Sequence, residues 1–221
     1  MKLYLAPMEA LTGYIFRNVY NRYFGDADRY FTPFIASRKL NSKEKNDVLP
    51  EHNQNMDVIP QILTNKSEEF CYIASRLKEY YGYEEVNLNL GCPSGTVVAK
   101  NRGSGFLAVP DELNRFFEEV FSRTDVRISV KTRTGVENNE NWENILKIYN
   151  DYPISELIIH PRCRKDGYGG KPNLEDFKKA VLISRHSLCY NGDINSVEDC
   201  NVITKEFPTV DKIMCGRGIL M

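Results

Sequence analysis

Short apolar segments alternate along the chain with longer segments in which apolar residues recur every three or four positions. A short apolar run bounded by polar residues is typical of a buried strand, whereas the longer period is typical of an amphipathic helix. Because both faces of a parallel sheet are covered, its strands read as apolar runs rather than as alternating ones. The runs predict eight strands, over residues 2–6, 30–34, 58–63, 85–90, 127–131, 156–160, 187–190 and 212–215.

Helical periodicity predicts helices in several of the intervals between these strands. Ser67 is expected to cap a helix that ends before Gly82, and Pro110 is expected to open the next one. Two more helices are expected over 142–149 and 174–181, and Ser196 with Asp199 forms a capping-box pattern for another. The long polar segment 41–57 is expected to be a loop that leads into or out of a helix.

Repeated alternation of strand and helix predicts the α/β class. Eight units favour a closed (β/α)8 TIM barrel, with an open doubly wound sheet as the alternative. No linker divides the sequence, so a single domain over residues 1–221 is expected. The sequence ends at GRGILM, directly after the eighth predicted strand, so the barrel is expected to lack its last helix.

The composition narrows the possible classes of protein. The 221 residues are 42% hydrophobic and 27% charged, which is a globular balance, and the formal net charge of −1 gives no overall attraction to nucleic acid. Six cysteines lie far apart without a C-x-x-C pair, which favours reduced thiols over a zinc site or a disulfide scaffold. With no apolar run long enough for a membrane span, a cytoplasmic protein without a membrane or metal partner is expected.

Polar or glycine-rich residues follow most of the predicted strands. In a barrel the carboxyl ends of the strands meet on one rim, where active sites lie. The candidates on that rim are Pro7, Met8, Gln61, Asn89, Cys92, Lys131, His160, Asn191, Gly192, Asp193, Gly216 and Arg217. For any one of them, a strand that simply ends in a polar residue as it reaches water is an equally good interpretation, but the set favours a common site.

Some of these candidates have a specific chemical use. The N-G-D-I and G-R-G segments expose backbone N–H groups near helix starts, where a phosphate binds well, although a tight turn explains G-R-G equally simply. Lys131 lies inside a strand, where an unpaired charge is costly unless its head reaches the surface. A lysine beside a flavin would stabilise the anionic reduced ring.

Several motifs, in this order, resemble those of the tRNA-dihydrouridine synthases: A-P-M, P-Q, N-L-G-C-P-S with a downstream G-S-G, V-K-x-R-x-G, H-x-R, N-G-D-I and G-R-G. The resemblance covers essentially the whole chain. It implies an FMN-dependent enzyme that uses NADPH to reduce the C5–C6 bond of uridines in tRNA, and it implies a C-terminal helical domain that this sequence lacks. The flavin contacts it implies are Pro7, Met8, Gln61, Lys131, His160, Asn191, Gly192, Asp193, Gly216 and Arg217.

The same resemblance assigns Cys92 as the acid that protonates C5 of the uracil. A cysteine with a pKa of about 8.5 is protonated at neutral pH and is still able to release its proton, although inert packing is the simpler alternative. Asn89 matches a polar residue beside flavin and uracil. Further substrate contacts are expected from Lys100, Arg102, Arg133, Arg162 and Tyr168, which follow strands on the rim, with surface charge or loop cover as the alternative for each.

Two other functions fit the same residues. One is another FMN barrel reductase that acts on a free pyrimidine or an enone, and the other is a catalytically silent RNA-binding remnant of the barrel. The sequence indicates neither an oligomeric state nor a particular uridine.

Overall fold

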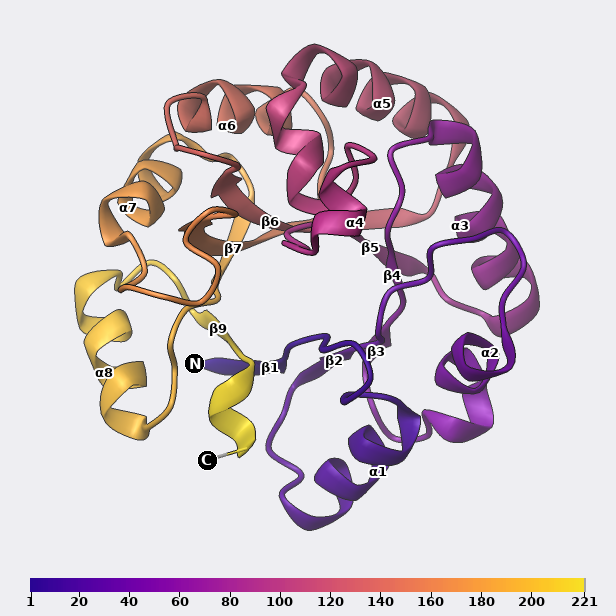
Figure 1. The fold of residues 1–221 in the computed structure, drawn as a ribbon. Coiled ribbons are helices and arrows are strands. Elements are labelled where there is room, and N and C mark those ends of the chain that lie inside the picture. The colour runs from indigo at the N-terminus through magenta and orange to yellow at the C-terminus, as the bar shows by residue number, and fades with distance from the viewer. Residues whose placement is uncertain (221) are drawn as a thin grey trace.

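The computed structural model describes residues 1–220 and contains a parallel β-sheet that curls into a barrel (Figure 1). The strands, in chain order, are β1 (Lys2–Leu5), β2 (Arg29–Phe31), β3 (Val58–Ile59), β4 (Gln61–Ile62), β5 (Glu85–Leu90), β6 (Arg127–Gly135), β7 (Glu156–Cys163), β8 (Ser187–Tyr190) and β9 (Lys212–Cys215). They pair in the order β3-β2-β1-β9-β8-β7-β6-β5-β4. The (β/α)8 barrel is confirmed, and the open doubly wound sheet is excluded.

The nine strands correspond to the eight predicted ones because Pro60 divides the third. Proline has no N–H to give to a sheet, so it interrupts the strand between Ile59 and Gln61. β3 pairs with β2 and β4 pairs with β5, so the interruption lies where the barrel closes. The Pro60 carbonyl still accepts a hydrogen bond from the Asn87 N–H at 2.8 Å.

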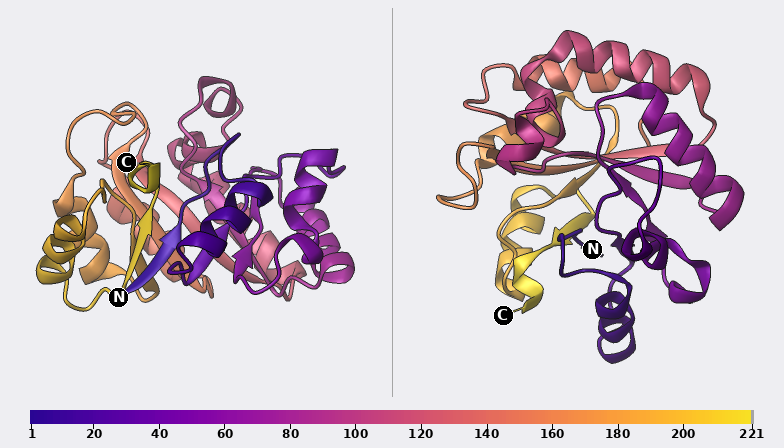
Figure 2. Two further views of the ribbon diagram at one scale, coloured as in Figure 1. Left: turned by 90° about the horizontal axis from the view of Figure 1, so that it is seen from below. Right: turned by 45° about the vertical axis from the view of Figure 1, so that its right-hand side comes forward.

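Helices surround the barrel on its outer side, except the short α4, which lies inside this ring over the end of the barrel (Figures 1 and 2). They are α1 (Tyr14–Tyr23), α2 (Ser42–Val48), α3 (Ser67–Tyr81), α4 (Gly95–Val98), α5 (Pro110–Arg123), α6 (Trp142–Asn150), α7 (Leu174–Ile183) and α8 (Val197–Glu206), with 3-10 turns η1 (Pro50–His52), η2 (Gly103–Ala108) and η3 (Arg217–Leu220). The five predicted helices are confirmed. After β9, η3 is the last element within residues 1–220.

Two local predictions are wrong. The segment 41–57 is not a loop, since it contains α2 and η1, and Asn41 begins α2 with a capping box to Glu44. Ser67 is not a cap but the first helical residue of α3; the N-cap is Lys66, which makes no side-chain cap bond. The Ser67 hydroxyl instead hydrogen-bonds the Glu119 carboxylate of α5, so a tertiary contact replaces the expected local one.

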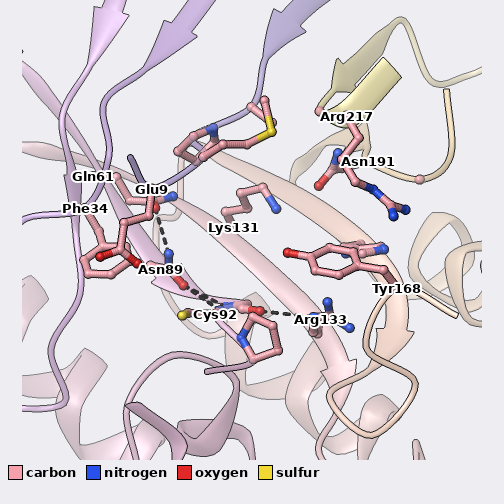
Figure 3. A pocket seen from close by; sticks show the side chains of 18 of the residues that line it. Glu9, Phe34, Gln61, Asn89, Cys92, Lys131, Arg133, Tyr168, Asn191 and Arg217 are labelled. Atoms are coloured by element: carbon pink, nitrogen blue, oxygen red, sulfur yellow. Dashed lines mark hydrogen bonds between the residues drawn. The ribbon is translucent and has the colours of Figure 1, made fainter. Parts of the chain in front are cut away.

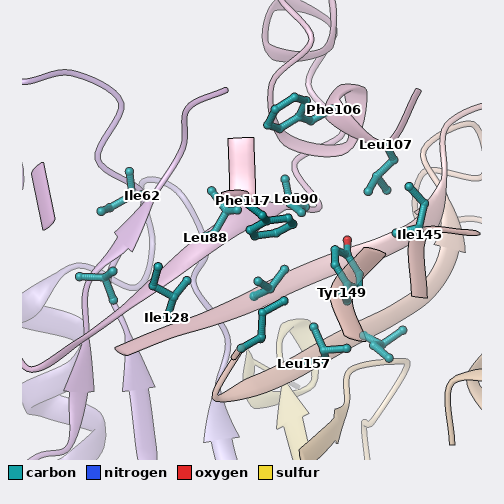
Figure 4. Close-up of a cluster of buried hydrophobic side chains, with 14 of the residues drawn as sticks. Ile62, Leu88, Leu90, Phe106, Leu107, Phe117, Ile128, Ile145, Tyr149 and Leu157 are labelled. Carbon is teal, nitrogen blue, oxygen red and sulfur yellow. The ribbon is translucent and has the colours of Figure 1, made fainter. Parts of the chain in front are cut away.

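The hydrophobic core forms three separate clusters, of which the smallest is Leu5, Tyr30 and Val58. The largest, the outer core layer, lies between the barrel and the helices and includes Leu88, Leu90, Phe117 and Tyr149 (Figure 4). A smaller cluster fills the barrel interior: Tyr4, Ala6, Phe31, Ile59, Ile158, Cys189 and Met214. The interior cluster is thus formed by every second residue of several strands, as a strand's period of two requires.

β5 does not read as the uniform apolar run that was expected. Val86, Leu88 and Leu90 belong to the outer core layer, whereas Asn87 and Asn89 alternate with them and hydrogen-bond across the barrel interior. All six residues of β5 are buried. The strand is therefore alternating because the barrel interior at this level is polar, and this polar side leads directly to the candidate site.

Candidate active site

A cavity of about 470 Å³ opens at the carboxyl ends of the barrel strands (Figure 3). This end of a barrel, formed by the loops after the strands, is where barrel enzymes place their chemistry. Most of the residues predicted from strand ends line it: Pro7, Met8, Gln61, Asn89, Cys92, Lys131, Arg133, His160, Tyr168, Asn191, Gly192, Asp193, Gly216 and Arg217. The structure therefore brings them together from the ends of seven strands, β1 and β4 to β9.

Cys92 is held in place by hydrogen bonds on both sides of its peptide unit. The N–H groups of Gly91 and Cys92 donate to Asn89 Oδ1 at 3.0 and 2.9 Å. The Cys92 carbonyl accepts from the N–H of Ser104 at 3.1 Å and from its hydroxyl at 2.8 Å. The G-S-G segment of the sequence therefore has a structural use, which is to fold back under the cysteine.

Gly103 makes this close approach possible. Its φ of +56° lies in the left-handed region that favours glycine, and a Cβ on it would lie 2.9 Å from both Cβ and O of Cys92. Any other residue here would push against the cysteine. The position of the thiol therefore depends on a glycine eleven residues downstream.

The Cys92 thiol is half-buried, and burial raises its pKa above the ordinary value. A backbone hydrogen bond from the Ser94 segment and the more distant Arg133 and Lys131 act in the opposite direction but do not outweigh burial. The thiol is consequently protonated at neutral pH, which is the state that a proton donor needs.

Lys131 extends from β6 toward the centre of the cavity (Figure 3). Burial, followed by repulsion from Arg133, lowers its pKa to about 8. Within residues 1–220, no carboxylate and no hydrogen bond contributes to the pKa shift of the Lys131 ammonium group. A partly desolvated cation without a protein partner suits an anionic or electron-rich ligand.

His160 presents a neutral imidazole to the cavity. Burial, and then the charges of Lys131, Arg133 and two further arginines, lower its pKa to about 2. Its Nε2 lies 3.1 Å from Nη1 of Arg162. Because a guanidinium can only donate, Nε2 is the acceptor, and the single imidazole proton is assigned to Nδ1.

Arg162 does not lie on the rim as expected. Its side chain is 1% exposed and forms an ion pair with Asp193, with Nη2 to Oδ2 at 2.6 Å and Nη1 to Oδ1 at 3.0 Å. Nε donates to the Gly169 carbonyl at 3.1 Å. The correction has a simple physical reason: the guanidinium is fully occupied inside the protein, so it organises β7 and the loop after it.

Asp193 has a different environment from the one expected of a phosphate contact. Hydrogen bonding from Arg162, and the nearby charge of Arg217, lower its pKa despite partial burial. Arg217 lies 3.3 Å from Asp193 Oδ1 and 4.6 Å from the centre of the Tyr168 ring. Arg217 is half-exposed, so it has free donors for an anion, whereas the Asp193 carboxylate serves to hold the two arginines.

Arg133 is also buried rather than exposed on the rim. It donates to the carbonyls of Gly91, Cys163 and Gly167 at 3.0, 2.8 and 2.9 Å. The side chain lines the cavity, but its donors join the cysteine loop to β7 and the Tyr168 loop. It therefore acts first as a connector between three segments of the site.

Lys100 and Arg102 lie outside the cavity. Lys100 is exposed, and Arg102 is half-buried with Nη2 3.2 Å from Glu69 Oε2. Several cavity residues were not predicted from the sequence, among them Glu9, which follows Met8, and Phe34, which lies after β2 (Figure 3). The strand-end rule that found their neighbours applies to both.

Within residues 1–220 no group of three or more histidine, cysteine or acidic side chains is arranged to hold a metal ion. Across the same residues no helix combines the length and the apolar character that crossing a bilayer requires.

The fold and the cavity define a (β/α)8 barrel with its site at the carboxyl ends of the strands. The solved structures to which it is similar include the old yellow enzyme homologue from Zymomonas mobilis, with a TM-score of 0.66, 11% identity and coverage of 98% of this chain and 84% of that one. Morphinone reductase gives a TM-score of 0.65 at 11% identity, with coverage of 98% and 82%. At these identities the likeness establishes the fold alone.

Sequence comparison is more specific. The model of the dihydrouridine synthase (Dus) family matches residues 4–221, and the chain belongs to that family. It is 28% identical over 221 residues to tRNA-dihydrouridine synthase B of Pasteurella multocida, covering 99% of this chain and 66% of that protein. It is 27% identical to probable tRNA-dihydrouridine synthase 1 of Synechocystis sp., covering 97% and 60%. The chain thus spans about two thirds or less of the length of these relatives.

Proposed function

We propose that this chain carries the catalytic site of a tRNA-dihydrouridine synthase, which reduces uridine to 5,6-dihydrouridine in tRNA with FMN as cofactor and NADPH as reductant. The observation that carries the proposal is the meeting of a protonated thiol, Cys92, and an unpaired ammonium group, Lys131, in one cavity of a member of the dihydrouridine synthase family.

The residues present fit a flavin mononucleotide. Within residues 1–220 Lys131 is a cation without a counter-ion, and Arg217, elsewhere on the cavity wall, has free donors for the phosphate. The backbone near Arg217 is close-packed: a Cβ on Gly218 would lie 1.9 Å from the Ile194 carbonyl. Glycine there lets the segments after β8 and β9 approach each other and leaves their N–H groups available to an anion.

Bound in this cavity and reduced by NADPH, FMN would supply the hydride that C6 of the uracil receives. Cys92 donates the proton that C5 requires, so that one hydride and one proton together saturate the C5–C6 bond. Burial keeps the thiol protonated before the reaction, and the Asn89 and Ser104 hydrogen bonds fix the backbone that carries it. The resulting thiolate regains its proton from water, which completes the turnover.

His160 and Lys131 complete the electrostatics of this arrangement. A neutral His160 offers a hydrogen-bond donor without adding to the positive charge of Lys131, Arg133 and Arg217. The ammonium of Lys131 stabilises negative charge on the cofactor. Tyr168 is 57% exposed at the cavity. Its ring offers an aromatic surface on which a base can pack after it has left the RNA stack.

The test uses the full chain purified with FMN. We expect NADPH-dependent formation of dihydrouridine, measured by mass spectrometry in tRNA that lacks the modification. Cys92→Ala should retain FMN while turnover falls by about 10²- to 10⁴-fold, the usual contribution of a positioned acid. Reduction of a free pyrimidine or an enone without any dihydrouridine would favour the rival reductase, and failure to bind FMN at all would favour the silent RNA-binding remnant.

A further inference from the structure

Five side chains and backbone groups form a continuous hydrogen-bonded chain from the cysteine loop into the barrel interior. Cys92 N–H donates to Asn89 Oδ1 at 2.9 Å, and Asn89 Nδ2 donates to Gln61 Oε1 at 2.7 Å. Gln61 Nε2 donates to Asn87 Oδ1 at 2.8 Å. Asn87 Nδ2 then donates to the Ser129 hydroxyl at 3.0 Å. All donations run in the same direction.

This direction is dictated at the cavity end. The N–H groups of Gly91 and Cys92 can only donate, so Asn89 must turn its oxygen toward them and its NH2 toward Gln61. Gln61 must then present its oxygen to Asn89, which leaves its NH2 for Asn87. The orientations of these amides follow from the network, although oxygen and nitrogen are otherwise interchangeable by shape.

The two side chains of this hydrogen-bonded chain that lie farthest from the cavity, Asn87 and Ser129, have no other evident role. Asn87 and Ser129 are fully buried and do not line the cavity, whereas Gln61 and Asn89 do. The pairing register places Gln61 opposite Asn87, and Asn87 opposite Ser129, on three neighbouring strands. Three fully buried polar side chains in the interior of a barrel are costly unless each is satisfied, and here they satisfy one another.

We propose that Asn87 and Ser129 are positioning residues that act through Gln61 to fix a donor surface on the cavity wall. Both oxygen lone pairs of Asn89 are used by backbone N–H groups, so its remaining polar capacity is one N–H. Gln61 likewise retains one N–H, together with one lone pair of its oxygen. The wall therefore offers two N–H donors to ligands that present carbonyl oxygens, such as a pyrimidine-dione or the isoalloxazine ring. The inference rests on the proposed function, since it assigns the wall to a flavin and a uracil.

The test measures the dissociation constant of FMN by fluorescence quenching, together with the visible absorption maximum of the bound flavin. Asn87→Leu keeps the size of the side chain but removes the acceptor for Gln61. We expect it to raise the FMN dissociation constant about tenfold, since one lost hydrogen bond in a buried site has about that effect, and to shift the absorption maximum. Asn87→Asp should rescue both, because its carboxyl group accepts from Gln61 in either protonation state.

Thr132→Val is the matched control. Thr132 is also buried on β6, but its hydroxyl meets Tyr149 on the helix side and is outside the network. We expect its FMN affinity to stay within about twofold of the wild type, as for a site without contact to the ligand. If Asn87→Leu does not fold, Asn87→Ala takes its place against Asn87→Asp.

The outcomes separate the two claims. A folded Asn87→Leu that binds FMN with unchanged affinity and spectrum, or a loss equal to that of Thr132→Val, overturns the positioning role. A wild-type protein that does not bind FMN instead overturns the proposed function, because the network would then have no flavin to orient.

Discussion

Replacing Lys131 by methionine should stabilise the ligand-free protein. Burial lowers the pKa of Lys131 to about 8 from an ordinary 10.5. Since one pKa unit corresponds to about 1.4 kcal/mol, holding this charge in the site costs about 3 kcal/mol, and solvent at the cavity mouth reduces the figure toward about 2 kcal/mol. Methionine keeps the length of the side chain and removes the charge. In a chain of this size the gain corresponds to roughly 5–10 °C in melting temperature.

The dependence on pH has a defined sign. Below pH 8 Lys131 is charged in the folded and the unfolded protein, so the full penalty is present. Between pH 8 and about 10.4 the unfolded chain still binds the proton while the folded protein has lost it, so wild-type stability rises with pH in this window. The advantage of Lys131→Met should therefore be largest at pH 7 and nearly absent above pH 10.

Urea denaturation of the ligand-free protein at pH 7 and pH 9.5 measures the effect, and Lys212→Met is the matched control. Lys212 also points into the barrel but pairs with Glu156, with Nζ to Oε1 at 3.0 Å. Removing it leaves a buried carboxylate unpaired, so this variant should be destabilised. If Lys131→Met were no more stable than the wild type at pH 7, Lys131 would not be an uncompensated charge, and the argument for an anionic ligand beside it would fail.

Two further changes test the surroundings of the site. Gly103→Ala places a residue with a side chain in the left-handed region and its Cβ against Cys92, so activity should fall at least about tenfold. Gly82→Ala, at φ +75° with no atom within 4 Å of the new Cβ, should cost a similar amount of stability, about 1–2 kcal/mol, and leave activity unchanged. Equal activities of the two variants would refute the link between Gly103 and the cysteine. His160 stays neutral when folded, with a pKa of about 2 against 6.5, so wild-type stability should fall as pH drops below 6.5. By pH 5 this loss should be about 2 kcal/mol larger than in His160→Gln by urea denaturation; parallel pH profiles would contradict the assignment.

The periodicity of the sequence was sufficient to predict the barrel, because eight separate apolar runs each form a strand and only Pro60 changes the count. Strand ends were sufficient to predict most of the cavity, since parallel strands place their carboxyl ends together. The prediction that failed is the exposure of two arginines on the rim. Arg133 and Arg162 lie near the carboxyl ends of β6 and β7, but their partners are distant backbone carbonyls and Asp193, which no local sequence pattern reveals.

The same limit explains the polar side of β5. The letters E-V-N-L-N-L alternate, and an alternating strand is usually one with a solvated face. In the fold that face points into a closed barrel, where Asn87 meets Gln61 from β4 and Ser129 from β6. The partners come from three strands that are up to 68 positions apart, so their satisfaction is visible only once the register is known.

The two ends of the barrel use charge in opposite ways. At the amino end Lys212 pairs with Glu156, and Arg29 lies 3.2 Å from Glu85 Oε1, so buried charges there are balanced by one another. At the carboxyl end the cation of Lys131 has no such partner among the residues that the structure describes, while the Asp193 carboxylate pairs with Arg162. An uncompensated charge lowers the stability of a fold, so Lys131 is a candidate for binding an anionic or electron-rich ligand. The asymmetry of charge therefore supports the proposed site at the carboxyl end of the barrel, independently of any motif.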